Sequence, residues 1–83
     1  MEEKLVELTS PVMGTFYRAS TPGGAPLAVV GQKIQASDIV CVVESMKIFT
    51  ELRSECSGIV RKILVENEEP VMKRQPLMVI EKE

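Results

Sequence analysis

The sequence contains an internal repeat, which limits the possible folds more than any other feature. Residues 7–14 (Glu-Leu-Thr-Ser-Pro-Val-Met-Gly) align with 51–58 (Glu-Leu-Arg-Ser-Glu-Cys-Ser-Gly) at an offset of 44, and 34–44 align with 71–81 at an offset of 37. The offsets differ by seven, so the first copy holds about seven extra residues between Gly14 and Ile34. One copy is too short to bury an apolar face alone, so we predict two strand-turn-strand units that pack as a two-fold-related pair.

The apolar runs predict strands and no long helix. β-branched residues dominate 39–43 and much of 59–65, and shorter runs of the same kind lie at 27–30 and 77–80. Clusters of Ser, Asn, Gly and Pro separate these runs and indicate turns. A chain of 83 residues that is 45% hydrophobic can build one compact core. We therefore predict an all-β fold in a single domain, residues 1–83.

Charge and missing residue types argue against several function classes. The formal net charge of −2 gives no electrostatic reason to bind nucleic acid or an anionic membrane. No stretch reads as a transmembrane helix or a signal peptide. The chain has no histidine, the commonest general base and metal ligand, and its two cysteines lack zinc spacing. We expect no metal, no catalytic residue, and reduced thiols at Cys41 and Cys56 in a cytoplasmic protein, with Cys41 buried.

A lone lysine, Lys47, lies between the two copies. The strand 39–44 leads into Ser45-Met46-Lys47 and continues as 48–52, which predicts a β-hairpin at the end of the molecule opposite the termini. Two-residue hairpin turns favour Asn-Gly or Asp-Gly because both central residues take positive φ, and Met46-Lys47 offers neither. A turn sequence that departs from this preference without a structural gain indicates a functional role. The residues alone leave open an uninterrupted strand through 45–48, with Met46 in the core and Lys47 on the surface.

The residues around Lys47 resemble a known attachment motif. Residues 44–48 (Glu-Ser-Met-Lys-Ile) are similar to the Ala-Met-Lys-Met motif of biotinyl domains. Further segments between residues 8 and 81 resemble the biotin carboxyl carrier proteins of bacterial-type acetyl-CoA carboxylase: 10–18, 30–34, 41–44, 57–58 and 63–66. The resemblance implies a flattened β-barrel or sandwich of two four-stranded antiparallel sheets with pseudo-two-fold symmetry. It also implies covalent biotin on Lys47, with biotin–protein ligase recognising the flanking residues Glu44, Ser45, Met46 and Ile48.

The extra residues of the first copy also have a counterpart in this family. They fall in the Pro- and Gly-rich stretch 19–26, which resembles a loop called the thumb that folds towards the biotin ring. The resemblance implies biotin contacts for Thr21, Pro22, Gly23 and Gly24. The family tends to have Ser-Pro-Asp where this chain has Thr-Pro-Gly-Gly, so the glycines should make this thumb more mobile. A solvated loop without ligand contact is the alternative.

The resemblance implies a non-catalytic carrier rather than an enzyme. Biotin carboxylase would carboxylate the biotin ring with ATP and bicarbonate, and carboxyltransferase would pass the carboxyl group to acetyl-CoA, giving malonyl-CoA for fatty-acid synthesis. Such carriers usually have an N-terminal region and a linker, so we expect this chain to be the C-terminal domain of a longer carrier.

Two alternatives remain. A lipoyl carrier of a 2-oxo acid dehydrogenase complex would fit Glu44-Ser45, because its motif is similar to Glu-Ser-Asp-Lys-Ala; Met46 in place of the aspartate, and the inserted loop, count against it. An unmodified regulatory homologue is the other, and the presence of Lys47 counts against it.

Overall fold

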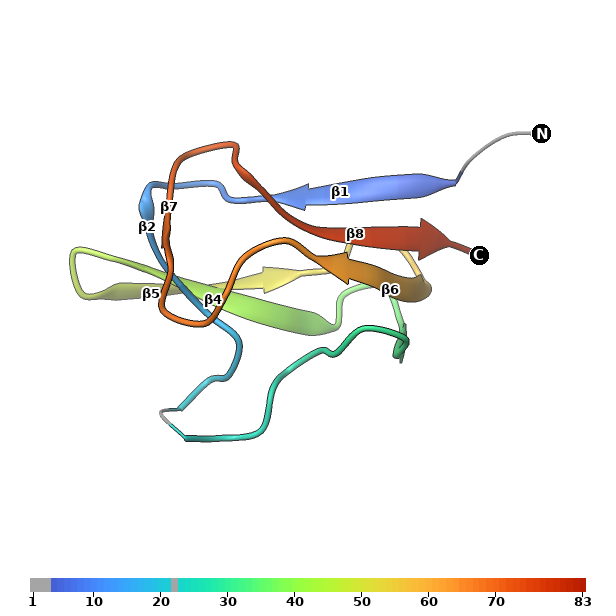
Figure 1. The fold of residues 1–83 in the computed structure, drawn as a ribbon, viewed down its shortest axis with the longest axis horizontal. Coiled ribbons are helices and arrows are strands. Elements are labelled where there is room, and N and C mark those ends of the chain that lie inside the picture. Colours follow the sequence, from blue (N-terminus) through green and yellow to red (C-terminus); the bar gives the residue numbers. More distant parts are fainter. Residues whose placement is uncertain (1–3, 22) are drawn as a thin grey trace.

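The structure, a computed structural model, describes residues 4–21 and 23–83. Within these residues the chain forms eight strands in two four-stranded antiparallel sheets (Figure 1). The strands are β1 (Leu5–Thr9), β2 (Gly14–Tyr17), β3 (Lys33–Ile34), β4 (Ile39–Ser45), β5 (Ile48–Arg53), β6 (Gly58–Ile63), β7 (Pro70–Val71) and β8 (Pro76–Lys82). The prediction of an all-β fold is confirmed.

The order of the strands confirms the pseudo-two-fold symmetry. One sheet has the order β1-β8-β6-β3 and the other β5-β4-β2-β7. The offsets of the repeat pair β1 with β5, β2 with β6, β3 with β7 and β4 with β8, and this exchange converts the first order into the second. Each sheet takes two strands from each copy. Neither copy therefore forms a sheet by itself, and each sheet needs strands from both copies.

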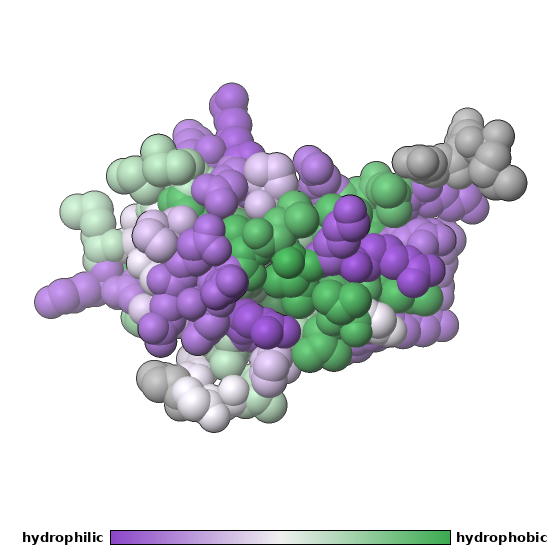
Figure 2. All heavy atoms as spheres, viewed as in Figure 1, coloured by the Kyte–Doolittle hydropathy of each residue, from purple (hydrophilic) through white to green (hydrophobic). Residues whose placement is uncertain are grey.

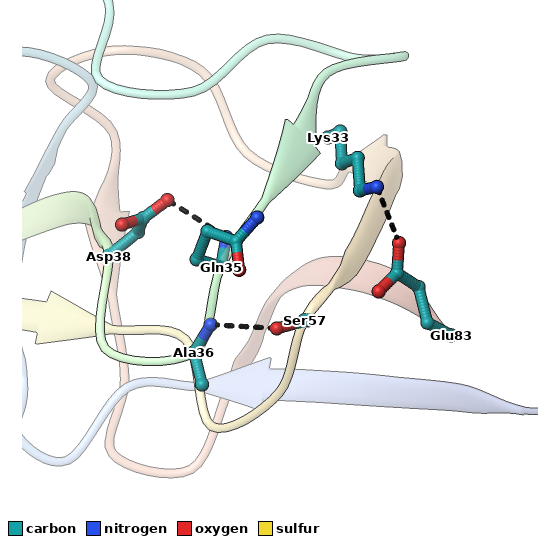
Figure 3. Close-up of polar contacts among 6 residues, drawn as sticks. All are labelled: Lys33, Gln35, Ala36, Asp38, Ser57 and Glu83. Carbon is teal, nitrogen blue, oxygen red and sulfur yellow. Dashed lines mark hydrogen bonds and ion pairs between the residues drawn. The ribbon is translucent and has the colours of Figure 1, made fainter.

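The turns that precede β4 and β8 show the repeat at atomic detail. The backbone N–H of Gln35 donates to Oδ2 of Asp38 at 2.9 Å (Figure 3). The turn at residues 72–75 makes the equivalent side-chain bond at 2.9 Å. Ser37 and Arg74 occupy the same place in the two turns, with φ of 76° and 71°. Both long strands are thus entered through the same turn, although the residues that build it differ.

The hydrophobic core lies between the sheets and has Phe16 as its largest side chain. Aliphatic residues from both copies surround it, and those with the least exposed surface include Ile34, Val43, Leu77 and Ile80. Two glycines allow strands to approach closely at equivalent places. A Cβ on Gly14 would lie 2.2 Å from the carbonyl oxygen of Glu44, and one on Gly58 would lie 2.1 Å from that of Glu81. Neither position has room for a side chain.

The predicted strand at 27–30 is wrong. Those residues form an irregular segment in which the N–H of Leu27 donates to the carbonyl of Arg18 at 2.7 Å. Only Ala28 is buried, while Val29 and Val30 are exposed. On the face shown in Figure 2, apolar side chains gather over β6 and the segment before β3. The apolar run therefore reflects one anchoring contact and an apolar surface rather than pairing in a sheet.

The cysteines match their predicted state. Cys41 is buried and Cys56 is half-buried, and both are free thiols. Within the described residues no helix is long and apolar enough to cross a membrane.

Candidate functional site

Strands β4 and β5 form a hairpin whose turn consists of Met46 and Lys47. In its register Ser45 lies opposite Ile48. Met46 has φ of 51° and Lys47 has φ of 66°. Both turn residues thus take the positive φ that the sequence predicted, and a non-glycine residue in that conformation costs roughly 1–2 kcal/mol. The alternative of an uninterrupted strand through 45–48 is wrong.

The turn projects into solvent at one end of the long axis of the molecule. The start of β1 and the end of β8 lie at the opposite end (Figure 1), as the repeat predicted. Met46 is 92% exposed and Ile48 67% exposed, so neither apolar side chain contributes burial to the core. Lys47 is exposed and takes part in none of the ion pairs found among the described residues. Its amine is therefore accessible to a large partner from several directions.

The remaining predicted residue of the hairpin, Glu44, is held against the outer face of its sheet. The hydroxyl of Tyr17 donates to Oε1 of Glu44 at 3.1 Å, and the ring of Tyr17 lies 6.2 Å from that of Phe49. This hydrogen bond first, then burial and the negative charges of Glu44 and Glu68, raise the pKa of Tyr17. Glu44 is thus half-buried and oriented, unlike Met46 and Lys47 at the tip.

The thumb, residues 19–26, lies beside the same outer face and leaves a pocket of about 510 Å³. Tyr17, Val42 and Phe49 form its wall on the sheet side. Thr21, Gly23 and Gly24 are among the thumb residues that line it, while their contact with biotin stays a prediction. Pro22, predicted with them, lies outside the described residues. Met46 and Lys47 are not part of the lining, but Phe49 lies two residues from Lys47 and connects the pocket with the turn.

Both thumb glycines have a role in the local turn. The N–H of Gly24 donates to the carbonyl oxygen of Thr21 at 3.0 Å, and Gly23 between them has φ of 74°. Positive φ at the third residue of such a turn strongly favours glycine. A Cβ on Gly24 would lie 2.6 Å from Oγ1 of Thr21. The glycines therefore allow a tight turn at the pocket, while the greater mobility expected from them stays a prediction.

The connection between β6 and β7 contributes a wall that the sequence did not predict. Asn67 and Glu68 line the pocket beside Arg18, and Oδ1 of Asn67 accepts a hydrogen bond from the backbone N–H of Arg18 at 2.9 Å. These residues lie 49 positions apart in the chain. In the sequence, residues 66–70 read only as a turn. The strand pairing brings them there, because β2 pairs with β7 and β3 with β6, so the β6–β7 connection lies beside the β2–β3 connection that carries the thumb.

Comparisons with known proteins agree with this geometry. Residues 6–80 match the biotin/lipoyl family model, described as a biotin-requiring enzyme. The chain is 47% identical over 78 residues to the biotin carboxyl carrier protein of acetyl-CoA carboxylase from Nostoc sp., covering 94% of this chain and 43% of that protein. The protein of the same name from Pseudomonas aeruginosa is 48% identical over 71 residues, covering 86% and 46%. The chain thus spans less than half the length of these curated relatives.

Solved structures share the fold. A single-chain, multi-domain long-chain acyl-CoA carboxylase matches with a TM-score of 0.83 and 20% identity, over 100% of this chain and 8% of that one. The urea carboxylase of Kluyveromyces lactis matches with a TM-score of 0.79 and 30% identity, over 96% of this chain and 6% of that one.

Proposed function

This chain belongs to the biotin/lipoyl family, and from that premise we propose that residues 1–83 form the biotin carrier domain of an acetyl-CoA carboxylase. Biotin is the covalent cofactor and Lys47 is its attachment site. The observation that carries the proposal is the exposed Met46-Lys47 turn, whose two residues are held at positive φ although neither is glycine or asparagine. That turn costs folding free energy and buries nothing, so its sequence is explained by recognition rather than by stability.

The attachment forms an amide between Lys47 and the acyl group of biotin. The deprotonated ε-amine attacks the carbonyl carbon of biotinyl-adenylate, a C–N bond forms, the C–O bond to the phosphate breaks, and AMP leaves with the bonding electrons. The attacking nitrogen gives up one proton to solvent or to the ligase and keeps the other as the amide N–H. Lys47 needs only exposure for this step, because the adenylate supplies the activated acyl group and the ligase supplies charge stabilisation.

The biotin–protein ligase recognises the residues around the turn. Met46 and Ile48 offer it exposed apolar side chains on either side of Lys47. Ser45 lies opposite Ile48, and Glu44 is fixed by Tyr17, so the base of the turn has a defined shape. Met46 also favours biotin over lipoate, because lipoyl motifs carry an aspartate there. A one-residue shift of the lysine along β5 would turn its side chain to the other face of the sheet.

The thumb pocket receives the ring of the attached biotin. Phe49 lies two residues from Lys47, which in a strand is about 7 Å. The lysine side chain and the acyl chain of biotin together exceed that length, so the ring reaches the pocket without any movement of the hairpin. Thr21, Gly23 and Gly24 would contact it from the thumb side and Phe49 and Val42 from the sheet side.

The domain works as a carrier and catalyses neither half-reaction. Biotin carboxylase adds a carboxyl group to the ring from bicarbonate with ATP, and carboxyltransferase passes it to acetyl-CoA to give malonyl-CoA for fatty-acid synthesis. Tethering raises the concentration of the ring at both active sites. The free thiols of Cys41 and Cys56 fit the reducing cytoplasm, where we place the protein.

The test is to express the chain with a biotin–protein ligase and biotin and to measure its intact mass and its binding to streptavidin. We expect the mass to rise by one biotinyl group, and Lys47→Ala to abolish both signals. Lipoylation of the chain by a lipoate ligase without biotinylation would support a lipoyl carrier instead. Labelling that persists in Lys47→Ala would refute the assignment of the site.

A further inference from the structure

The thumb pocket contains one basic and one acidic side chain that the attachment of biotin does not use. Arg18 and Glu68 both line the pocket. Nε of Arg18 is buried and has no hydrogen-bond partner among the described residues, and Arg18 is absent from the ion pairs found there. A buried charged donor without an acceptor is costly, so such a group calls for an explanation. Arg18 also lines the pocket, so its guanidinium group is placed to donate a hydrogen bond to an acceptor on a molecule bound there.

Negative charge prevails beside this arginine. Glu68 lies in the wall, and Glu44 is hydrogen-bonded to the hydroxyl of Tyr17 in the same wall. The charges of both carboxylates act on Tyr17, since both contribute to its raised pKa. The described lining thus presents a single basic group, Arg18, against two carboxylates in and next to it. This balance suits a neutral group with both donors and acceptors better than an anion.

The ureido ring of biotin has that character before it is carboxylated. Its carbonyl oxygen accepts hydrogen bonds and its two N–H groups donate them. The guanidinium of Arg18 can only donate and a carboxylate such as that of Glu68 accepts, so the two side chains supply complementary partners. Carboxylation replaces the hydrogen of one ring nitrogen by a carboxylate. The ring then loses a donor and gains a negative charge, in a pocket that Glu68 lines and beside whose wall residue Tyr17 lies Glu44.

We propose that the thumb pocket distinguishes the two states of the cofactor: Arg18 and Glu68 hold the neutral ureido ring, and carboxylation releases the ring into solvent. This inference rests on the proposed attachment of biotin to Lys47 and adds a charge-dependent control of where the ring resides. An unloaded ring is kept at the domain, whereas a loaded ring is free to enter the carboxyltransferase site. The selectivity lies in Glu68, and the donor for the ring carbonyl is Arg18.

The test follows the thumb in three states of the ¹⁵N-labelled domain: unmodified, biotinylated, and biotinylated then carboxylated with biotin carboxylase, ATP and bicarbonate. The reporters are the amide signals of Gly23 and Gly24 and the Nε–H signal of Arg18, recorded at low temperature and mildly alkaline pH. Biotinylation should shift all three signals. Carboxylation should return them towards the unmodified positions, with the docked population reduced about tenfold, a typical effect of a like charge at 4–6 Å on a protonation equilibrium.

Two variants assign the roles of the side chains. Glu68→Gln removes the charge and keeps the size, so the carboxylated ring should stay docked to within about twofold of the neutral ring. Arg18→Gln should lose the docked state in both forms, with an unchanged circular dichroism spectrum. Glu55→Gln is the matched control, because Glu55 is exposed and lies outside the pocket, and it should behave like the wild type.

The outcomes separate this proposal from the proposed function. A chain that gains no biotinyl mass refutes the attachment and the pocket selectivity together. A biotinylated chain whose thumb signals are the same before and after carboxylation refutes the selectivity alone. Docking that strengthens on carboxylation also refutes it, and would assign Arg18 to the carboxylate instead.

Discussion

Replacing Met46 by asparagine should stabilise the domain while impairing its modification. Met46 has φ of 51° and is 92% exposed, so the change removes almost no buried surface. An ordinary residue in the left-handed region costs roughly 1–2 kcal/mol. Asparagine is several-fold enriched there, which corresponds to relief of about 1 kcal/mol. The free energy of unfolding should therefore rise by about 1 kcal/mol, and Tm by about 4–8 °C for a domain of this size.

Two measurements on Met46→Asn check this reasoning. Urea unfolding of the unmodified domain gives the stability change, and the time course of biotinylation by the ligase gives the functional change. We expect at least a tenfold slower modification, since even one methylene more or less in an apolar pocket changes specificity by roughly 10- to 200-fold. A less stable Met46→Asn domain would refute the strain in the turn. Modification at the wild-type rate would refute the contact between Met46 and the ligase.

Ile48→Asn provides the matched control. Ile48 is also an exposed apolar neighbour of Lys47, but it lies in β5 and is absent from the residues with positive φ. The same substitution there relieves no strain and places a poor strand former in an edge strand, so we expect up to about 1 kcal/mol of destabilisation. Opposite signs for the two asparagine variants would show that the gain at position 46 comes from its backbone conformation.

Two further predictions concern the core of the fold. Gly14→Ala and Gly58→Ala should each lower the free energy of unfolding, measured in urea, by more than about 2 kcal/mol, because the new Cβ would meet a carbonyl oxygen at 2.2 and 2.1 Å. Gly31 has φ of 92° but open space around it, so Gly31→Ala should lower the free energy of unfolding by only about 1 kcal/mol. Equal losses at all three positions would contradict the close approach of the strands. Burial raises the pKa of the Cys41 thiol from 9.0 to about 12, so the folded domain keeps a proton that the unfolded chain loses. This contribution to stability is complete below pH 9 and falls as the pH rises towards 12, by up to about 4 kcal/mol. In urea unfolding, Cys41→Ala should lose less free energy of unfolding over this pH range than the wild type. The same pH profile for both proteins would contradict the raised pKa of the Cys41 thiol.

The sequence predicted the architecture because its two copies follow the same local rules. The offsets of 44 and 37 hold in the strand orders, in the turns before β4 and β8 and in the close contacts of Gly14 and Gly58. Sequence patterns failed at 27–30, where an apolar run usually indicates a strand. There the thumb closes through backbone bonds, and the run has no partner strand.

The candidate site also has one part that the sequence could predict and one part that it could not. The turn at Met46 and Lys47 could be predicted, because hairpin geometry is local and demands positive φ at adjacent residues. The pocket could not be, since Asn67 and Glu68 reach Arg18 only through the packing of two distant connections. Their sequence gives turn signals alone, and the charges that line the pocket become visible only when the connections lie side by side.

The position of the turn opposite the ends of β1 and β8 has a mechanical consequence. The described chain measures 42 Å along its longest axis, and its strands form a stiff body. A partner fixed at the β1 and β8 end would hold Lys47 at a distance of that order. The sandwich would then serve as a rigid spacer that holds the lysine at that distance, whereas a flexible linker with the same average reach, about 60 residues long, would adopt many shorter, coiled conformations.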